Sequence, residues 1–243
     1  MSQEIATNQL IWKYFRAMKP IQHIAFIMDG NGRWAKAQGK SRQEGHKAGF
    51  DNLVELLKEC KKLGLQSATC YAFSTENWSR PKPEIDFLMN IPMELYKQRK
   101  QELLDTQIKI QFVGRRDRLP QHTLQAIEQI EADTSRFLGF TGYIAFDYGS
   151  QDELVRVVNK LLADPSITQV DETLISSHLD VPAIDLLIRT SGEVRLSNFL
   201  LWQCAYAELL FVDTYWPDFT PARLHEALKE YNERSRRFGG LKE

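Results

Sequence analysis

Apolar residues follow two spacings along this chain. Short apolar runs predict strands at residues 24–28, 68–73, 108–113, 143–146, 185–188 and 209–212. Longer stretches in which apolar residues recur every three or four positions predict helices at residues 45–63, 83–104, 122–138, 152–162 and 221–236. Because strands and helices alternate, we expect an α/β fold. Its single domain would hold an open, mostly parallel six-stranded sheet flanked by helices.

Polar segments follow three of the predicted strands. Residues 29–34 read Asp-Gly-Asn-Gly-Arg-Trp, residues 74–80 read Ser-Thr-Glu-Asn-Trp-Ser-Arg, and residues 189–198 begin Arg-Thr-Ser-Gly-Glu. Open parallel sheets bind their ligands beyond the carboxyl ends of the strands. The pattern therefore predicts that these three arginine-bearing loops gather at one edge of the sheet and form a binding site.

The first loop combines an acid with a glycine turn. Gly30 and Gly32 allow backbone N–H groups to face a phosphate. Asp29 would repel that phosphate unless a cation lay between them, which favours a diphosphate held through Mg²⁺. The alternative is a tight strand-to-helix turn that binds no ligand.

The third loop carries a second set of phosphate-binding groups. Arg189 and Arg195 can each form paired hydrogen bonds to phosphate oxygens, and the Ser197 hydroxyl can add a short one. The alternative is a solvated loop whose arginines form weak surface ion pairs.

Nucleotide-binding motifs fit the first loop poorly. Residues 30–35 match the G-x-G-x-x-A dinucleotide pattern, but the ribose-binding acid expected about 20 residues on would be Asp51 or Glu55, within a predicted helix. A P-loop ending at Gly39 would need glycine where Trp34 stands. A dinucleotide-dependent oxidoreductase is therefore disfavoured.

Composition and charge bear on the partners and the cellular location of the protein. The 243 residues carry a net charge of −1, which argues against a nucleic-acid partner. The three cysteines are widely spaced and do not indicate a disulfide framework. We find no signal peptide and no apolar run of the roughly 18 residues that a membrane span needs, so we expect a cytoplasmic protein. Residues 1–19 form an amphipathic segment that either packs on the domain of residues 20–243 or contacts the inner membrane surface.

Several motifs together resemble the cis-prenyltransferases, and within them the bacterial undecaprenyl diphosphate synthases. The matching segments are residues 29–35, 45–49, 73–81, 185–193, 195–203 and 205–208. The segment Asp147-Tyr-Gly-Ser-Gln-Asp152 departs from the Asn-Tyr-Gly-Gly-Arg pattern more common in that family. The resemblance implies a parallel sheet with a hydrophobic tunnel. We expect residues 83–104 in the tunnel wall, through Phe87, Leu88, Met89, Ile91 and Leu95; the alternative is that these side chains are ordinary core.

The resemblance also implies residue roles. Asp29 would hold Mg²⁺, Glu208 would complete the metal site, and Asn77 would accept a proton. The departing diphosphate or a water molecule is an alternative acceptor, because a neutral amide is a weak base. The residues implied for the allylic substrate, farnesyl diphosphate, are Gly30, Asn31, Gly32, Arg33, Arg42 and His46. Those implied for positioning substrate are Trp34, Ser74, Thr75, Glu76, Trp78 and Arg80. Isopentenyl diphosphate would bind Arg189, Arg195, Leu196 and Ser197.

The implied activity is the addition of isopentenyl units to an allylic diphosphate with formation of cis double bonds. The implied product is a long-chain polyprenyl diphosphate, undecaprenyl diphosphate, which serves as the cell-wall lipid carrier, and the implied assembly is a homodimer. A second hypothesis is a non-catalytic prenyl-lipid-binding or scaffold subunit of the same fold.

Overall fold

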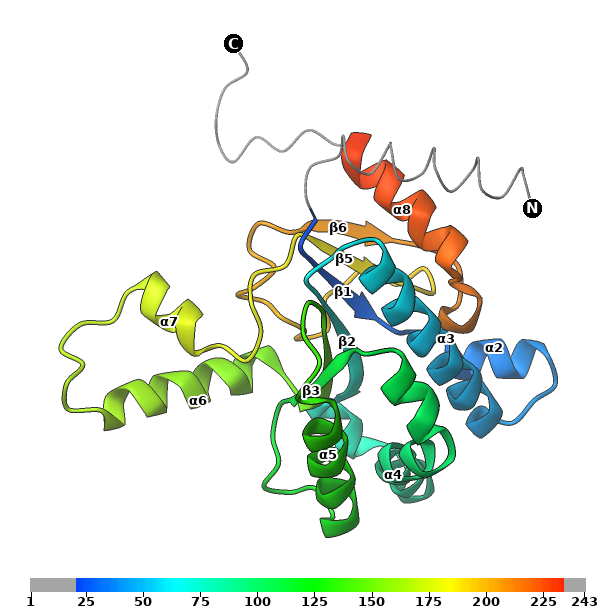
Figure 1. Ribbon diagram of the computed structural model, residues 1–243, viewed down its shortest axis with the longest axis horizontal. Coiled ribbons are helices and arrows are strands. Elements are labelled where there is room, and N and C mark those ends of the chain that lie inside the picture. Colours follow the sequence, from blue (N-terminus) through cyan, green and yellow to red (C-terminus); the bar gives the residue numbers. More distant parts are fainter. Residues whose placement is uncertain (1–20, 234–243) are drawn as a thin grey trace.

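Six strands form one open sheet in the order β3-β4-β2-β1-β5-β6, and every neighbouring pair runs parallel (Figure 1). The computed structural model describes residues 21–233, without the side chain of Leu95. The predicted segment 1–19 and the end of the last predicted helix lie outside the described residues. The strands are β1 (His23–Ile27), β2 (Ser67–Ser74), β3 (Lys109–Val113), β4 (Thr141–Tyr148), β5 (Leu186–Arg189) and β6 (Glu208–Phe211).

Helices connect the strands and confirm the predicted α/β class. They are α2 (Asn31–Ala37), α3 (Arg42–Lys62), α4 (Lys82–Asp105), α5 (Gln121–Thr134), α6 (Ser150–Ala163), α7 (Glu172–His178) and α8 (Pro221–Glu233). Two short 3-10 helices, η1 (Thr75–Ser79) and η2 (Trp216–Asp218), follow β2 and precede α8. All six predicted strands and all five predicted helices are present among these elements, with shifted ends.

Side chains that alternate along the strands build cores on both faces of the sheet. Ile24 and Phe26 of β1 pack with α3 and α8 residues such as Leu56 and Leu228. The intervening residues of β1 pack on the opposite face, where segments after α7 and β5 cover them. Burial on both faces is the reason that the strands read as continuous apolar runs.

Two differences from the predicted helix ends have local causes. Helix α3 begins three residues earlier than expected, because Ser41 caps its first turn and the Glu44 carboxylate accepts the Ser41 N–H at 2.8 Å. Helix α5 ends at Thr134 rather than at residue 138, and Leu138 is 85% exposed beyond its end. The short helices α2 and α7 were not predicted, since seven residues carry too few apolar repeats.

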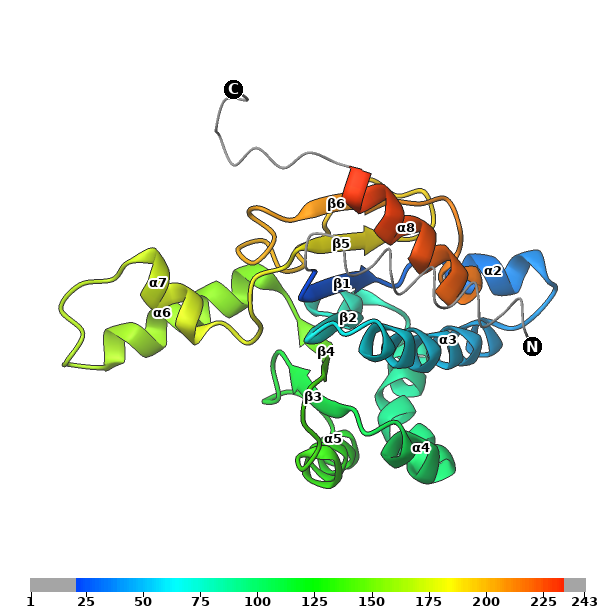
Figure 2. The same cartoon turned by 45° about the horizontal axis from the view of Figure 1, so that its top comes forward.

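Two pairs of helices stand apart from the central strands. Helices α4 and α5 lie side by side near β3 (Figures 1 and 2), and α4 is interrupted at Arg99, where φ is −129° and ψ is 23°. Helices α6 and α7 project together away from the sheet, to the left in both views (Figures 1 and 2). No helix in the described part of the chain is long and apolar enough to span a membrane.

Candidate active site

The first polar loop leaves the end of β1 in the middle of the sheet. Asp29 is held by its backbone: its carbonyl accepts the Thr190 hydroxyl at 2.7 Å and the Trp216 N–H at 3.0 Å, while its N–H donates to the Thr190 Oγ1 at 3.0 Å. The backbone of Asp29 is therefore fixed at the end of β1, and its side chain is 29% exposed.

Gly30 is required at the turn for two reasons. Its φ is 104°, in the region that favours glycine. A Cβ there would also lie 2.8 Å from the Tyr215 ring and 2.9 Å from the Ser191 hydroxyl. The absence of this side chain allows the backbone after β1 to pack against the loop after β5.

The third loop meets the first through a nearly buried arginine. Because β1 and β5 are neighbours with Ile27 opposite Arg189, their carboxyl ends lie side by side. Arg189 is 4% exposed, and its Nη2 donates to the Asp29 Oδ2 at 3.0 Å. Its Nη1 donates to the Ser197 Oγ at 2.7 Å and to the Arg195 carbonyl at 2.5 Å. The structure thus brings Asp29, Arg189 and Ser197 together as the sequence predicted.

Two acidic groups hold the remaining arginines of these loops. Arg33 donates to the Asp29 Oδ1 and to the Glu193 Oε1, each at 3.1 Å, and Arg195 lies 2.5 Å from the other Glu193 oxygen. The hydrogen bond from Arg195 lowers the pKa of Glu193. These ion pairs hold the arginines near one another without a bound anion, so an incoming phosphate meets donors that are already gathered.

The second loop connects to the third. Asn198 donates from its amide to the Glu76 carboxylate at 3.0 Å, and its Oδ1 accepts the Gln151 N–H, also at 3.0 Å. The Asn77 Oδ1 accepts the Ser74 N–H at 3.1 Å. The Asn77 amide therefore stabilises the start of η1, and the polar residues of all three loops occupy one edge of the sheet.

A polar cavity of about 550 Å³ lies beside the glycine turn. Its lining combines that turn with basic groups from α2, from the start of α3 and from the end of η1: Met28, Asp29, Gly30, Asn31, Gly32, Arg33, Lys36, Gly39, Lys40, Arg42, His46 and Arg80. Burial lowers the pKa of His46 to about 4, so its ring is neutral at neutral pH. The cavity therefore presents guanidinium groups, backbone N–H groups and one carboxylate.

Several predicted residues lie outside this cavity. The Trp34 indole donates to Asp218 at 2.8 Å, and the Trp78 indole donates to the buried Asp147 at 2.8 Å. Leu196 packs against the core on the far face of the sheet. These contacts indicate that Trp34, Trp78 and Leu196 shape the loops.

The predicted pairing of Asp29 with Glu208 is not supported within one chain. Glu208 begins β6 opposite Leu186, the first residue of β5, whereas Asp29 follows the end of β1. Glu208 is level with Ile24 of β1, two strands away. Because parallel strands rise about 3.3 Å per residue and lie about 4.8 Å apart, Asp29 and Glu208 are roughly 19 Å apart. In residues 21–233 no group of three or more His, Cys, Asp or Glu side chains could hold a metal ion.

Asp29 nevertheless fits a magnesium ion bound together with a substrate. Mg²⁺ in phosphate sites is held by one or two carboxylates, with phosphate and water oxygens as its other ligands. Asp29 lines the polar cavity, and its side chain is 29% exposed. A single partly exposed carboxylate suits an ion that enters with a diphosphate.

Sequence reasoning missed two acidic groups that organise the site, Glu84 and Asp147. Glu84 lies 2.9 Å from the Arg80 guanidinium and 3.2 Å from that of Arg42. Buried Asp147 accepts hydrogen bonds from Arg118 at 2.6 and 2.5 Å, as well as from the Trp78 indole. The four-residue spacing of Arg80 and Glu84 is a signal that could have suggested the first pairing, but no local pattern indicates the second.

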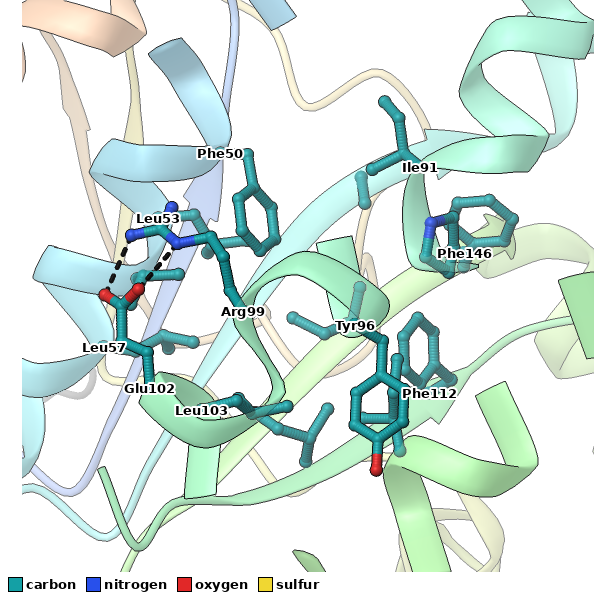
Figure 3. Close-up of a pocket in the computed structure, with 16 residues that line it drawn as sticks. Phe50, Leu53, Leu57, Ile91, Tyr96, Arg99, Glu102, Leu103, Phe112 and Phe146 are labelled. Carbon is teal, nitrogen blue, oxygen red and sulfur yellow. Dashed lines mark hydrogen bonds and ion pairs between the residues drawn. The ribbon is translucent and has the colours of Figure 1, made fainter. Parts of the chain in front are cut away.

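An apolar cavity of about 120 Å³ lies between α3, α4 and the sheet (Figure 3). Phe50 and Leu53 of α3 face Ile91 and Tyr96 of α4 across it, and Phe112 of β3 lies at its other side. A third cavity of about 250 Å³ contains His46, Phe50, Phe87 and Ile91 in its lining. It shares His46 with the polar cavity and shares Phe50 and Ile91 with the apolar one.

Comparison with known proteins extends these observations. Residues 27–239 match the prenyltransferase family model described as "Putative undecaprenyl diphosphate synthase". The chain is 44% identical over 228 residues to an isoprenyl transferase of Bacillus thuringiensis subsp. konkukian, with 90% of this chain and 88% of the relative covered. It is 45% identical over 225 residues to an isoprenyl transferase of Neisseria meningitidis, with 91% and 90% covered.

Solved structures give the same result. Lavandulyl diphosphate synthase from Lavandula x intermedia, in complex with dimethylallyl diphosphate, superposes with a TM-score of 0.85 at 35% identity. That match covers 90% of this chain and 98% of the other. A probable undecaprenyl diphosphate synthase from Campylobacter jejuni has a TM-score of 0.79 at 29% identity, with 91% and 100% covered.

Proposed function

The chain belongs to the prenyltransferase family of the undecaprenyl diphosphate synthases and is a prenyl-transferring enzyme, and we propose that it adds isopentenyl diphosphate units to farnesyl diphosphate with cis double bonds. The product would be a long-chain polyprenyl diphosphate, undecaprenyl diphosphate. The observation that carries the proposal is the pair of arginine-bearing loops that meet at Asp29 beside a polar cavity, with a separate apolar cavity under α4.

The allylic diphosphate would occupy the polar cavity. Backbone N–H groups of the glycine turn, together with Arg42 and Arg80, can donate to its oxygens. Asp29 would hold Mg²⁺, which when bound neutralises diphosphate charge and stabilises the leaving group. Donors already fixed in place lower the barrier to departure of the diphosphate, because charge develops there in the transition state.

Isopentenyl diphosphate would bind at the third loop. Ser197 and Arg195 belong to this loop, and the Arg189 guanidinium is hydrogen-bonded both to Ser197 and to Asp29. Binding there would place the alkene beside the allylic carbon as its diphosphate departs. The alkene attacks this carbon, and loss of a proton then forms the double bond of the added isoprene unit. The Asn77 oxygen already accepts an N–H, which favours the departing diphosphate or a water molecule as the proton acceptor.

The growing chain would extend through the three cavities. In support, His46 borders both the polar and the third cavity, and Phe50 and Ile91 border both the third and the apolar cavity. Aromatic and aliphatic walls suit a prenyl chain, since each methylene group removed from water contributes about 0.8 kcal/mol. Of the α4 residues expected in the wall, Ile91 lines the apolar cavity and Phe87 the third one, whereas Leu88 and Met89 are buried in the core with α5. The side chain of Leu95, also expected there, is outside the described residues.

A homodimer is supported by the exposed face of α6. Val155, Val158 and Leu162 are 60%, 45% and 76% exposed on this projecting helix (Figure 1). Three large apolar side chains on one helix face suit an interface with a second copy. Contact of residues 1–19 with a membrane surface stays a prediction, as does a cytoplasmic location.

The alternative to the proposed enzyme is a non-catalytic lipid-binding subunit. Such a chain needs the apolar cavity but has no need of Asp29, Arg189 and Arg195 in one ion-paired group. Their presence favours catalysis. The proposal is tested with purified protein, farnesyl diphosphate, labelled isopentenyl diphosphate and Mg²⁺. We expect label in extractable lipid and a polyprenyl product by mass spectrometry. Binding of farnesyl diphosphate without incorporation of label would favour the alternative.

A further inference from the structure

Glu84 lies at the meeting point of three basic side chains of the polar cavity. It occupies the first turn of α4, and its side chain is 12% exposed. One of its oxygens, Oε1, accepts a hydrogen bond from the Arg80 Nη1 at 2.9 Å. The same oxygen lies 3.2 Å from the Arg42 Nε and 3.9 Å from the His46 Nε2.

These partners come from separate elements. Arg42 begins α3, and Arg80 follows η1. Both arginines line the polar cavity, whereas Glu84 does not. Glu84 therefore lies behind the arginines, where it can hold them without occupying the space of the ligand.

The position of Arg42 shows what this contact achieves. A Cβ at position 32 would lie 3.3 Å from the Arg42 Nε, so the guanidinium rests directly against the glycine turn. The Arg42 side chain is 60% exposed, and within residues 21–233 its one ion pair is with Glu84. An exposed arginine loses side-chain conformational entropy when it is fixed. A buried carboxylate that fixes it beforehand reduces that cost when an anion binds.

The charge balance leaves the cavity attractive to anions. Burial lowers the pKa of His46 to about 4, which keeps its ring uncharged at neutral pH. Two guanidinium groups therefore face one Glu84 carboxylate, and the group as a whole keeps a positive charge for the ligand.

We infer that Glu84 is a positioning residue for the allylic diphosphate: it holds Arg42 and Arg80 at the glycine turn so that both guanidinium groups bind the same diphosphate. The inference rests on the proposed function and adds a residue to it. Glu84 acts through the arginines and does not contact the substrate.

The test compares Glu84→Ala and Glu84→Gln with wild type. We expect Glu84→Ala to raise the dissociation constant and KM of farnesyl diphosphate about tenfold, with the KM of isopentenyl diphosphate unchanged. Glu84→Gln keeps an oxygen acceptor but loses the charge, so its dissociation constant for farnesyl diphosphate should rise less than in Glu84→Ala and clearly more than in the control variant. The matched control is Asp86→Ala, which removes an acid two residues away that pairs with Lys82 at 3.0 Å on the exposed side of the same turn; it should change neither constant.

A double-mutant comparison separates positioning from a purely structural role. In an Arg42→Ala, Arg80→Ala background, Glu84→Ala should have no further effect on farnesyl diphosphate binding measured by calorimetry. A lower dissociation constant in Glu84→Ala than in wild type would show that Glu84 competes with the ligand, and would overturn the inference. Unchanged constants in a folded variant would overturn it as well. If the wild-type protein gives no product, the proposed function is refuted instead. If Glu84→Ala does not fold, Glu84→Gln decides: the inference requires Glu84→Gln to lose more affinity for farnesyl diphosphate than Asp86→Ala does.

Discussion

At the residue scale, the site is organised by opposite charges that bind one another before any ligand arrives. Asp29 pairs with both Arg33 and Arg189, and Glu193 pairs with Arg33 and Arg195. Arg189 is the exception in burial, because the other arginines are largely exposed. A nearly buried guanidinium needs its hydrogen-bond partners, and Asp29, Ser197 and the Arg195 carbonyl supply them.

Replacement of Asp29 by Asn tests the metal-binding role. We expect turnover to fall at least about 100-fold, because one preorganised electrostatic contact contributes roughly that much. Mg²⁺ should also lose most of its effect on the affinity for farnesyl diphosphate, which calorimetry with and without Mg²⁺ measures. Asp29→Ala should in addition lower the melting temperature, since Arg189 loses its charged partner. A normal rate in Asp29→Asn at saturating Mg²⁺ would contradict the role.

Arg195→Ala tests the assignment of the third loop. Arg195 is exposed and held by Glu193 at 2.5 Å, so its removal should leave the fold intact. We expect the KM of isopentenyl diphosphate to rise about tenfold or more through loss of a phosphate contact. Steady-state kinetics with each substrate varied in turn provides the measurement. Arg223→Ala, which removes an exposed arginine paired with Glu226 on α8, is the control.

At the element scale, the glycine turn depends on how closely α2 packs against α3. A Cβ on Gly45 would collide with the Asn31 carbonyl oxygen and would lie 2.9 Å from the Ala35 Cβ. A Cβ on Gly49 would likewise collide with the Asn31 side chain. The two glycines of α3 thus allow α2, which carries Asn31 and Arg33, to lie directly on it.

Gly45→Ala should therefore displace α2. We expect a loss of about 1–3 kcal/mol in the free energy of unfolding, as for other overpacked sites, together with weaker binding of farnesyl diphosphate. Chemical denaturation and calorimetry measure the two effects. Lys62→Ala, at an exposed position in the last turn of α3, should leave both unchanged. Normal stability in Gly45→Ala would show that α2 can shift without cost.

The exposed face of α6 makes a separate prediction. Val158→Asp puts a charge in the middle of the apolar row formed with Val155 and Leu162. If that face joins two copies, sedimentation velocity should show a dimer for wild type and a monomer for the variant. Lys160→Asp puts an acid at an exposed position about 140° around the helix from Val155, on another face of α6, and should remain dimeric.

At the scale of the whole molecule, stability depends on histidines that the fold keeps neutral. His23 begins β1, is 2% exposed, and its Nε2 lies 2.7 Å from the Thr69 hydroxyl. Burial is the main cause that lowers its pKa from 6.5 to about 4, even though Asp185 acts in the opposite direction. His46 has a similarly lowered pKa.

The direction of the pH effect follows from these values. Between pH 6.5 and pH 4 the unfolded chain binds protons at His23 that the folded chain does not, so stability falls as the pH falls through this window. Near pH 4, His23 lowers the free energy of unfolding by roughly 3 kcal/mol relative to neutral pH. Urea titrations at several pH values should show it, and His23→Gln should reduce the dependence. An identical pH dependence in the folded variant would contradict this account.

The sequence determined the strands, the main helices and the three polar loops, because burial on both faces makes the strands of a parallel sheet read as apolar runs. It also placed Asp29 and Arg189 at the same edge of the sheet, since the carboxyl ends of parallel strands lie together. Tertiary structure alone decided which side chains meet. It separated Glu208 from Asp29 by strand order and direction, and it set Glu84 against Arg42 through the packing of α3 beside α4. Contacts between distant segments depend on packing in three dimensions, which local spacing along a chain does not encode.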